Sequence, residues 1–259
     1  MADTFIWYEL ITPDPDAASA FYKAVTGWNA AEMPNATPDG SPYTILSAGE
    51  RGVGGILRLD DAMGEAGMKP IWIGYIGVAD ADEAARRIAE AGGSIHMAPT
   101  DIPDVGRFAM AADPGGAVFY VMTPLPREDA PPPAEGGEIG TFGWRELYSS
   151  AGEKASFAFY SGLFGWETMH EMPMGEMGTY RLFGADGVQM GGMMDKPANV
   201  PASIWGYYVN VDGIDAAAER VKAAGGQVLM GPMEVPGGSW IVQCVDPHGA
   251  AFALVSAGR

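Results

Sequence analysis

Strand-like and helix-like hydrophobic patterns follow one another in a fixed order along the first part of the chain. An apolar stretch at 4–12 precedes residues 14–27, where apolar residues recur every three or four positions and predict a helix. An aspartate can cap the start of this helix and a glycine its end, and the spacing places Ala17, Phe21 and Ala24 on one face. Three short strand-like runs follow, at 28–33, 43–48 and 52–59. The order predicts a βαβββ unit.

The same order returns before the middle of the chain. Four positions of the first helix recur 66 residues later, as the pairs Asp14/Asp80, Asp16/Asp82, Ala18/Ala84 and Gly27/Gly93. The second helical pattern is again followed by three strand-like runs, at 94–99, 107–112 and 117–122. The first half of the chain therefore predicts two βαβββ units in succession.

The second half of the chain repeats the first. The repeat is carried by residue pairs 133 to 138 positions apart, namely Trp7/Trp144, Glu9/Glu146, Phe21/Phe159, Tyr22/Tyr160, Trp28/Trp166, Gly54/Gly191, Trp72/Trp205, Pro99/Pro232, Asp113/Asp246 and Phe119/Phe252. Chance does not keep so many matches in order with only small insertions, so the chain is a tandem duplication containing four βαβββ units.

A segment rich in proline and charge separates the two copies. Its sequence, PLPREDAPPPAEGG at 124–137, cannot build a strand or a buried helix and is typical of an exposed linker. We therefore predict an α+β protein with a first domain at 1–124, a linker at 125–139 and a second domain at 140–259.

Composition and charge narrow the range of partners. The chain has 259 residues, 47% of them hydrophobic, and a net charge of −18, which disfavours binding to nucleic acid or to an anionic membrane. The single cysteine, Cys244, lies in an apolar run, so we expect a buried thiol and no intrachain disulfide. No signal peptide or spanning segment is recognisable. The expectation is a soluble cytoplasmic monomer or homodimer that binds a small molecule.

Paired βαβββ units with these motifs resemble the vicinal oxygen chelate superfamily of glyoxalase I, extradiol dioxygenases, bleomycin-resistance proteins and fosfomycin-resistance enzymes. The motifs are the helix openings DPDAASAFY and EKASFAFY, GW after the helix, AGG before the sixth strand, and DPGGAVFYV and DPHGAAFAL before the last strand. The resemblance covers nearly the whole chain outside the linker. It implies two glyoxalase-like domains whose sheets curl into open barrels, with helices outside and a cup inside.

In this family the metal ligands come from the first strand of a unit and from its last strand, just after the DP turn. The resemblance places Trp7 and Trp144 at the first-strand position, and Tyr120 and Ala253 at the position of the usual glutamate. The central-strand candidates are Trp72 or Ile73 in the first copy, and Trp205 or Gly206 in the second. None of the three histidines, His96, His170 and His248, falls at a ligand position. We therefore expect metal-free cups, or at most a weakly held divalent ion.

One carboxylate per copy remains on the expected inner face. Glu9 and Glu146 each lie two residues after a tryptophan and share its strand face. They are predicted polar anchors or general bases, and Arg58 or Arg181 could reach them. The predicted ligand-binding walls are Trp7, Trp72, Tyr120, Trp144 and Trp205. The alternative for the tryptophans is core packing, with the glutamates at strand ends in water.

A methionine cluster lies in the second copy, with seven of the 16 methionines at positions 169–194. Flexible thioethers fill gaps in a core, and they also suit a pliable ligand-facing surface.

Three functions remain open at this stage. The chain could be a bleomycin-resistance-like protein that sequesters a small molecule in metal-free aromatic cups. It could instead be a lyase, isomerase, hydroxylase or dioxygenase-like enzyme of the superfamily, with Glu9 or Glu146 as general base. In a third reading the second copy mainly supports one working cup. Fold alone does not choose among these readings.

Overall fold

The computed structural model describes residues 3–33, 37–38, 40–126, 134 and 136–259, and its elements follow the predicted order in both copies. The first copy consists of β1 (Phe5–Thr12), α1 (Pro15–Thr26), β2 (Asn29–Met33), β3 (Tyr43–Ala48), β4 (Arg51–Arg58), a short α2 (Asp61–Glu65), β5 (Ile71–Gly77), α3 (Ala81–Glu90), β6 (Ser94–Ile102), β7 (Gly106–Ala112) and β8 (Val118–Pro124). The predicted βαβββ order is confirmed, since α2 is only an addition between the two units.

The second copy repeats this order without a counterpart of α2. Its elements are β9 (Phe142–Ser149), α4 (Glu153–Phe164), β10 (Glu167–Pro173), the 3₁₀ turn η1 (Gly175–Met177), β11 (Thr179–Ala185), β12 (Val188–Asp195), β13 (Ile204–Asn210), α5 (Ile214–Ala223), β14 (Gln227–Glu234), β15 (Trp240–Val245) and β16 (Ala251–Ser256). The described part of the predicted linker contains no helix or strand, and its residues 127–133 and 135 lie outside the described residues.

The helix α1 begins where the sequence predicts, but it buries a different face. Asp14 caps the helix by accepting the backbone N–H of Ala17 at 3.0 Å, and Gly27 ends it in the left-handed region with φ of 78°. The buried residues are Ala18, Phe21, Tyr22 and Val25. The predicted face is therefore wrong for Ala17 and Ala24, which are exposed, because the larger Tyr22 and Val25 bury more apolar area and turn the helix by one position.

Each copy forms one eight-stranded mixed sheet. The strand order is β2-β3-β4-β1-β5-β8-β7-β6 in the first sheet and β10-β11-β12-β9-β13-β16-β15-β14 in the second. Strand β1 runs parallel to β4, with Glu9 opposite Gly55, and β9 runs parallel to β12, with Glu146 opposite Gly192. The sheets are open, with β2 and β6, and β10 and β14, as their edges. The α+β class predicted from the sequence is confirmed.

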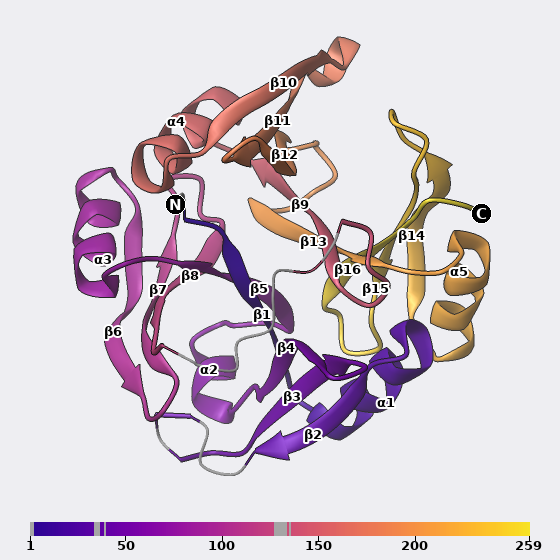
Figure 1. The fold of residues 1–259 in the computed structure, drawn as a ribbon, viewed down its shortest axis with the longest axis horizontal. Coiled ribbons are helices and arrows are strands. Elements are labelled where there is room, and N and C mark those ends of the chain that lie inside the picture. The colour runs from indigo at the N-terminus through magenta and orange to yellow at the C-terminus, as the bar shows by residue number, and fades with distance from the viewer. Residues whose placement is uncertain (1–2, 34–36, 39, 127–133, 135) are drawn as a thin grey trace. The chain divides into compact units, whose positions relative to one another are not determined.

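The two compact units of the structure do not coincide with the two copies of the repeat, because each unit contains residues from both copies. Unit 1 consists of 1–7, 73–127 and 145–206, and unit 2 of 8–72, 128–144 and 207–259. Within unit 1 the helix α3 contacts α4, and within unit 2 α1 contacts α5, as Figure 1 shows. The domain boundaries at 124 and 140 remain a prediction from the repeat.

The recurring aromatic and aspartate motifs build the core of unit 2. The indole N–H of Trp72 donates to the hydroxyl of Tyr22 at 2.7 Å, and this hydroxyl donates to the carboxylate of Asp246 at 3.2 Å. The indole of Trp28 stacks on Tyr22 and donates to the carbonyl oxygen of Gly140 at 2.7 Å. Both acceptors lie in the second copy and both donors to them in the first, so buried polar bonds tie the two copies together within this unit.

Unit 1 repeats the arrangement with the copies exchanged. Trp205 donates to Tyr160 at 2.9 Å, and Tyr160 donates to Asp113 at 3.2 Å. Trp166 donates to the carbonyl oxygen of Asp3 at 2.6 Å. Burial raises the pKa of Asp113, and the hydrogen bonds that its carboxylate accepts, including the one from Tyr160, oppose this rise. The motifs that mark the repeat are thus explained largely by the fold.

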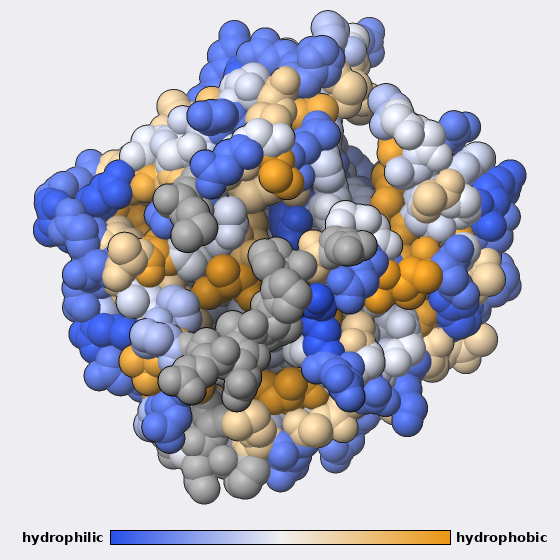
Figure 2. Space-filling view, in the orientation of Figure 1, coloured by the Kyte–Doolittle hydropathy of each residue, from blue (hydrophilic) through white to orange (hydrophobic). Residues whose placement is uncertain are grey.

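The outer faces of the helices are polar, as expected for an amphipathic helix with one buried stripe. In α3 the buried residues are Ala81, Ala84, Ala85 and Ile88, whereas Glu83, Arg86 and Glu90 form an exposed ion-paired row. Figure 2 shows hydrophilic surface over α3 and α5. None of the helices in the described part of the chain is long and apolar enough to cross a membrane.

Candidate ligand-binding site

The carboxylate of Glu146 lies buried in unit 1, beside a tyrosine that the sequence did not indicate. Glu146 is 8% exposed, and the hydroxyl of Tyr180 on β11 donates to its Oε1 at 2.9 Å. Gly192, the residue opposite Glu146 on β12, makes this contact possible, because a Cβ there would overlap the Tyr180 ring. The glycine pair of the repeat therefore makes room for a side chain that reaches the carboxylate.

Two buried methionines lie on β12, one on each side of Gly192 in the sequence. Side chains alternate along a strand, so Met194 points to the side of Gly192, whereas Met190 lies at an irregularity in the pairing of β12 with β11. Met190 is 7% exposed and Met194 is 6% exposed. The corresponding residues of the first copy are Val53 and Leu57, so the thioethers belong to the second copy alone. Polarizable, flexible side chains thus lie on the strand that pairs with Glu146.

The first copy places Glu9 in a related setting within unit 2. Glu9 is 5% exposed and lies opposite Gly55 on β4. A Cβ on Gly55 would overlap the phenol of Tyr43, so the Tyr43 ring covers this glycine as Tyr180 covers Gly192. Neither glutamate lies in bulk solvent, and each has a tyrosine ring over the glycine opposite it.

The central strands β5 and β13 each place a tyrosine opposite the last-strand candidate of the same copy. Tyr75 on β5, and not Trp72 or Ile73, lies opposite Tyr120 in the parallel register, and the two rings stack with centroids 4.2 Å apart. In the second copy Tyr208, and not Trp205 or Gly206, lies opposite Ala253. Its hydroxyl accepts a hydrogen bond from Gln243 at 2.9 Å. These positions were missed because strand register depends on residues far apart in the sequence.

The four predicted tryptophan walls fall into two groups. Trp72 and Trp205 are both 3% exposed and donate their indole N–H groups to the core tyrosines. This geometry favours the packing alternative, and a ligand-binding role for them stays an untested prediction. Trp7 and Trp144 are half-buried at strand positions β1 and β9 and share a face with Glu9 and Glu146. They remain the better candidates for contact with a ligand.

The arginines suggested as partners of the glutamates bind elsewhere. The guanidinium of Arg181 pairs with buried Glu153 at 2.8 Å and with Glu171 at 2.6 Å, because Arg181 points to the opposite face of β11 from Tyr180. Arg58 donates to the carbonyl oxygen of Pro13 at 2.9 Å. As expected, Cys244 is buried, and desolvation raises the pKa of its thiol to about 12.

The residues at the family's ligand positions do not fit a divalent metal. These positions, as the resemblance gives them, hold Trp7, Trp72 or Ile73, and Tyr120 in the first copy, and Trp144, Trp205 or Gly206, and Ala253 in the second. Indole, phenol and aliphatic side chains are not the imidazole and carboxylate donors that such an ion needs. The described residues contain no group of three or more histidine, cysteine, aspartate or glutamate side chains placed to hold an ion.

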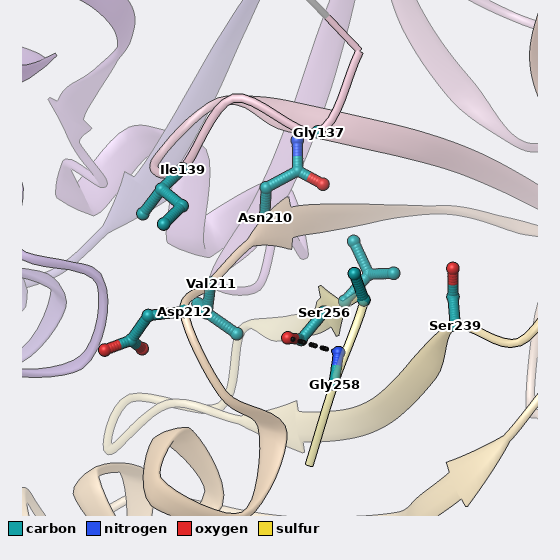
Figure 3. Close-up of a pocket in the computed structure, with 10 residues that line it drawn as sticks. Gly137, Ile139, Asn210, Val211, Asp212, Ser239, Ser256 and Gly258 are labelled. Atoms are coloured by element: carbon teal, nitrogen blue, oxygen red, sulfur yellow. Dashed lines mark hydrogen bonds between the residues drawn. The ribbon is translucent and has the colours of Figure 1, made fainter.

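A separate cavity of about 270 Å³ lies in unit 2, at the end of β13 (Figure 3). Its ten lining residues include Asn210, Asp212 and Ser256, and none of the predicted site residues. Its polar side chains already have partners: Asn210 donates to Thr141 at 3.1 Å, and Asp212 pairs with Arg220 at 3.0 Å. The cavity is small for a ligand site, and we assign it no function.

The family is now defined by both fold and sequence. Residues 4–121 and 153–254 match the model of the Glyoxalase/Bleomycin resistance protein/Dioxygenase superfamily, and the chain belongs to this superfamily. The resemblance drawn from the motifs is thereby confirmed.

Particular relatives extend over nearly the whole chain. The chain is 32% identical over 249 residues to "Putative glyoxylase CFP32" of Mycobacterium bovis, with 96% of this chain and 93% of CFP32 covered. It is 29% identical over 265 residues to the anthracycline biosynthesis protein DnrV of Streptomyces peucetius, with 96% and 91% covered.

Solved structures share the fold at much lower sequence identity. The Mn(II)-bound glyoxalase of Novosphingobium aromaticivorans aligns with a TM-score of 0.62 at 16% identity, covering all of this chain and 82% of that one. The 2,2',3-trihydroxybiphenyl 1,2-dioxygenase of Sphingomonas wittichii aligns with a TM-score of 0.67 at 11% identity, covering all of this chain and 92% of that one. At these identities the likeness concerns the fold alone.

Proposed function

We propose that the chain is a small-molecule-binding protein that holds its ligand with the buried carboxylates of Glu9 and Glu146, without a metal. The observation that carries this proposal is the contact of 2.9 Å between the Tyr180 hydroxyl and Glu146, built over a glycine that the repeat retains. A buried carboxylate is costly to keep unless hydrogen bonds satisfy it. A polar group of the ligand would add a donor at the same place.

The ligand that suits these surroundings is flat, apolar over most of its area, and neutral or cationic. Tyrosine rings and thioethers favour a polarizable aromatic surface. The net charge of −18 disfavours an anion and attracts a cation. The relative DnrV is named for anthracycline biosynthesis, which supports an anthracycline as the first probe.

A second candidate function is proton transfer beside a carbonyl group, with a glutamate as general base. The same contact favours it, because a phenol hydrogen-bonded to a carboxylate can return the proton that the carboxylate removes. The name of the relative CFP32 supports an enzyme of this kind. Incubation of candidate ligands in deuterium oxide, followed by mass spectrometry, would detect exchange at the carbon beside the carbonyl.

The binding proposal is tested by titrating the protein with an anthracycline and following the fluorescence of its seven tryptophans. Glu146→Gln and Glu9→Gln remove a charged acceptor, and loss of a charged hydrogen bond predicts roughly 10–100-fold weaker binding for a variant whose carboxylate contacts the probe. Glu50→Gln, in the exposed turn between β3 and β4, makes the same charge change as a control.

The titration can contradict the binding proposal, and it can also show which copy holds the ligand. Binding that stays within twofold of the unmodified protein in both variants would show that the anchors lie elsewhere. A loss in Glu146→Gln only would assign the working site to the second copy. Deuterium exchange that disappears in Glu146→Gln while the dissociation constant is unchanged would favour the enzyme over the binding protein.

A further inference from the structure

The hairpin that joins β10 to β11 contains more methionines than the corresponding hairpin of the first copy. Residues 169–177 read MHEMPMGEM, with four methionines and one histidine in nine positions; we call this segment the methionine hairpin. The equivalent segment of the first copy, 31–39, reads AEMPNATPD and has one methionine. The methionines are therefore not a property of the repeat.

Packing does not account for these side chains. Met177 is 54% exposed and Met169 is 36% exposed, whereas methionine is usually a buried residue. The strand β10 is an edge of its sheet, and six of its seven residues are exposed. Met172 and Met174 are half-buried, so none of the four methionines of the segment is a fully buried core residue.

The backbone of the hairpin brings several of the donors to one place. His170 and Met172 lie opposite Leu182 and Tyr180 in the antiparallel register, so both point to the same face of β10. Two residues along a strand separate Cα atoms by roughly 6.6 Å, which two flexible side chains can span toward a shared ion.

A tight turn then folds the next methionines back on this end of the strand. The N–H of Met174 donates to the carbonyl of Gly178 at 2.8 Å, and the N–H of Met177 donates to the carbonyl of Met174 at 3.2 Å. Gly175 and Gly178, with φ of 61° and 82°, allow this turn. Met174 and Met177 therefore lie in the tight turn that follows Met172 at the end of β10.

The donor set selects the class of ion. Thioether sulphur is a soft ligand that favours Cu(I) and its analogue Ag(I), whereas calcium and magnesium need oxygen ligands. The nearby carboxylate of Glu171 is already paired with Arg181 at 2.6 Å. The strongly negative net charge raises the local concentration of any cation.

We propose that the methionine hairpin binds one Cu(I) ion through the sulphurs of Met172, Met174 and Met177, with a nitrogen of His170 as fourth ligand. The proposal does not depend on the proposed function, but Met172 lies opposite Tyr180, whose hydroxyl donates to Glu146. Met169 is left out, because its sulphur lies over Gly184, where an added Cβ would come within 3.0 Å of it.

The test uses Ag(I), which shares the ligand preference of Cu(I) without changing oxidation state. The full-length protein is labelled with ¹³C in its 16 methionine methyl groups and titrated with silver nitrate. We expect the signals of Met172, Met174 and Met177 to shift and to saturate at one equivalent. The only cysteine does not compete, because Cys244 is 1% exposed and its thiol stays protonated.

Substitution of the proposed ligands distinguishes silver binding at this site from non-specific binding of silver elsewhere on the protein. Loss of an outer partner already costs roughly 10–100-fold in metal affinity, so Met172→Leu with Met174→Leu should weaken binding by at least about 100-fold. Leucine has nearly the same volume, so the fold should be kept. Met63→Leu with Met68→Leu, two half-buried methionines near α2, is the matched control.

Three results would overturn the proposal. One is the absence of a shift at one equivalent in the unmodified protein, a measurement that does not depend on any variant folding. The second is a shift spread evenly over all the methionine signals. The third is equal silver affinity in the Met172/Met174 variant and in the control.

Discussion

Replacement of Tyr22 by phenylalanine tests whether the bonds that join the two copies stabilise unit 2. The hydroxyl of Tyr22 accepts from Trp72 at 2.7 Å and donates to Asp246 at 3.2 Å. Phenylalanine keeps the ring and its contacts with Trp28 and Phe252, so the change removes only the oxygen.

The expected loss follows from what remains buried without partners. The indole N–H of Trp72, a residue 3% exposed, would lose the acceptor described for it, and an orphaned buried donor costs about 1–3 kcal/mol. Asp246 would keep the N–H groups of His248 and Ala250, both at 2.9 Å, and lose one charged hydrogen bond. Together these effects predict a decrease of about 2–4 kcal/mol in the free energy of unfolding, a large part of the usual 5–15 kcal/mol.

The assay is urea unfolding at pH 7, followed by fluorescence and circular dichroism. Trp72→Phe and the double variant complete a thermodynamic cycle. The loss caused by Tyr22→Phe should be smaller when Trp72 is already replaced, because no indole N–H is then stranded. Tyr160→Phe should behave alike in unit 1, where the bonds are 2.9 and 3.2 Å long.

Alkaline pH adds an independent measurement. Burial, followed by the nearby charge of Asp246, raises the pKa of Tyr22 well above 10. The stabilisation from this group is therefore complete below pH 10 and decreases as the pH rises from 10 toward the folded-state pKa, because the unfolded state loses the proton first. The stability difference between the unmodified protein and Tyr22→Phe should narrow above pH 10. A loss below about 1 kcal/mol at pH 7, or a difference that does not change with pH, would refute the reasoning.

Three further predictions concern the site and its supports. Gly192→Ala should displace the Tyr180 ring and weaken ligand binding. Gly206→Ala is the control and should leave binding unchanged, because its Cβ would meet only a carbonyl oxygen at 3.7 Å. Equal binding constants for the two variants would contradict this prediction. Glu153→Gln should cost about 1.5–3 kcal/mol in urea unfolding, because Arg181 loses its buried partner and keeps only Glu171, which is exposed, and a cost under 1 kcal/mol would count against that role. Elemental analysis after dialysis should find less than one equivalent of iron, zinc, nickel or manganese, and a full equivalent would mean that the carboxylates hold a metal after all.

The fold was predictable because its signals are local. Each strand-like run at 43–48 and 117–122 became a strand, and Asp14 and Asp80 cap the helices that they were expected to cap. The repeat supplied the remaining order, since each copy confirmed the pattern of the other.

The candidate site was predictable only in part, because it depends on register between strands. Glu9 and Glu146 are buried as the shared face with a tryptophan suggested. Their surroundings were not foreseen. Arg58 or Arg181 could have reached the glutamates, yet Tyr180, the neighbour of Arg181, is the residue that donates to the carboxylate of Glu146. A displacement of one residue along a strand reverses the face of every side chain, and local sequence cannot fix it.

The pairing of Tyr22 with Asp246 also bears on how the chain folds as it is made. The two residues are 224 positions apart, so the core of unit 2 stays incomplete until the ribosome has added nearly all of the sequence. At typical rates of translation this wait is roughly 10–45 s. During that time the apolar face of α1 has no partner from the second copy, and a chaperone has its longest opportunity to bind there.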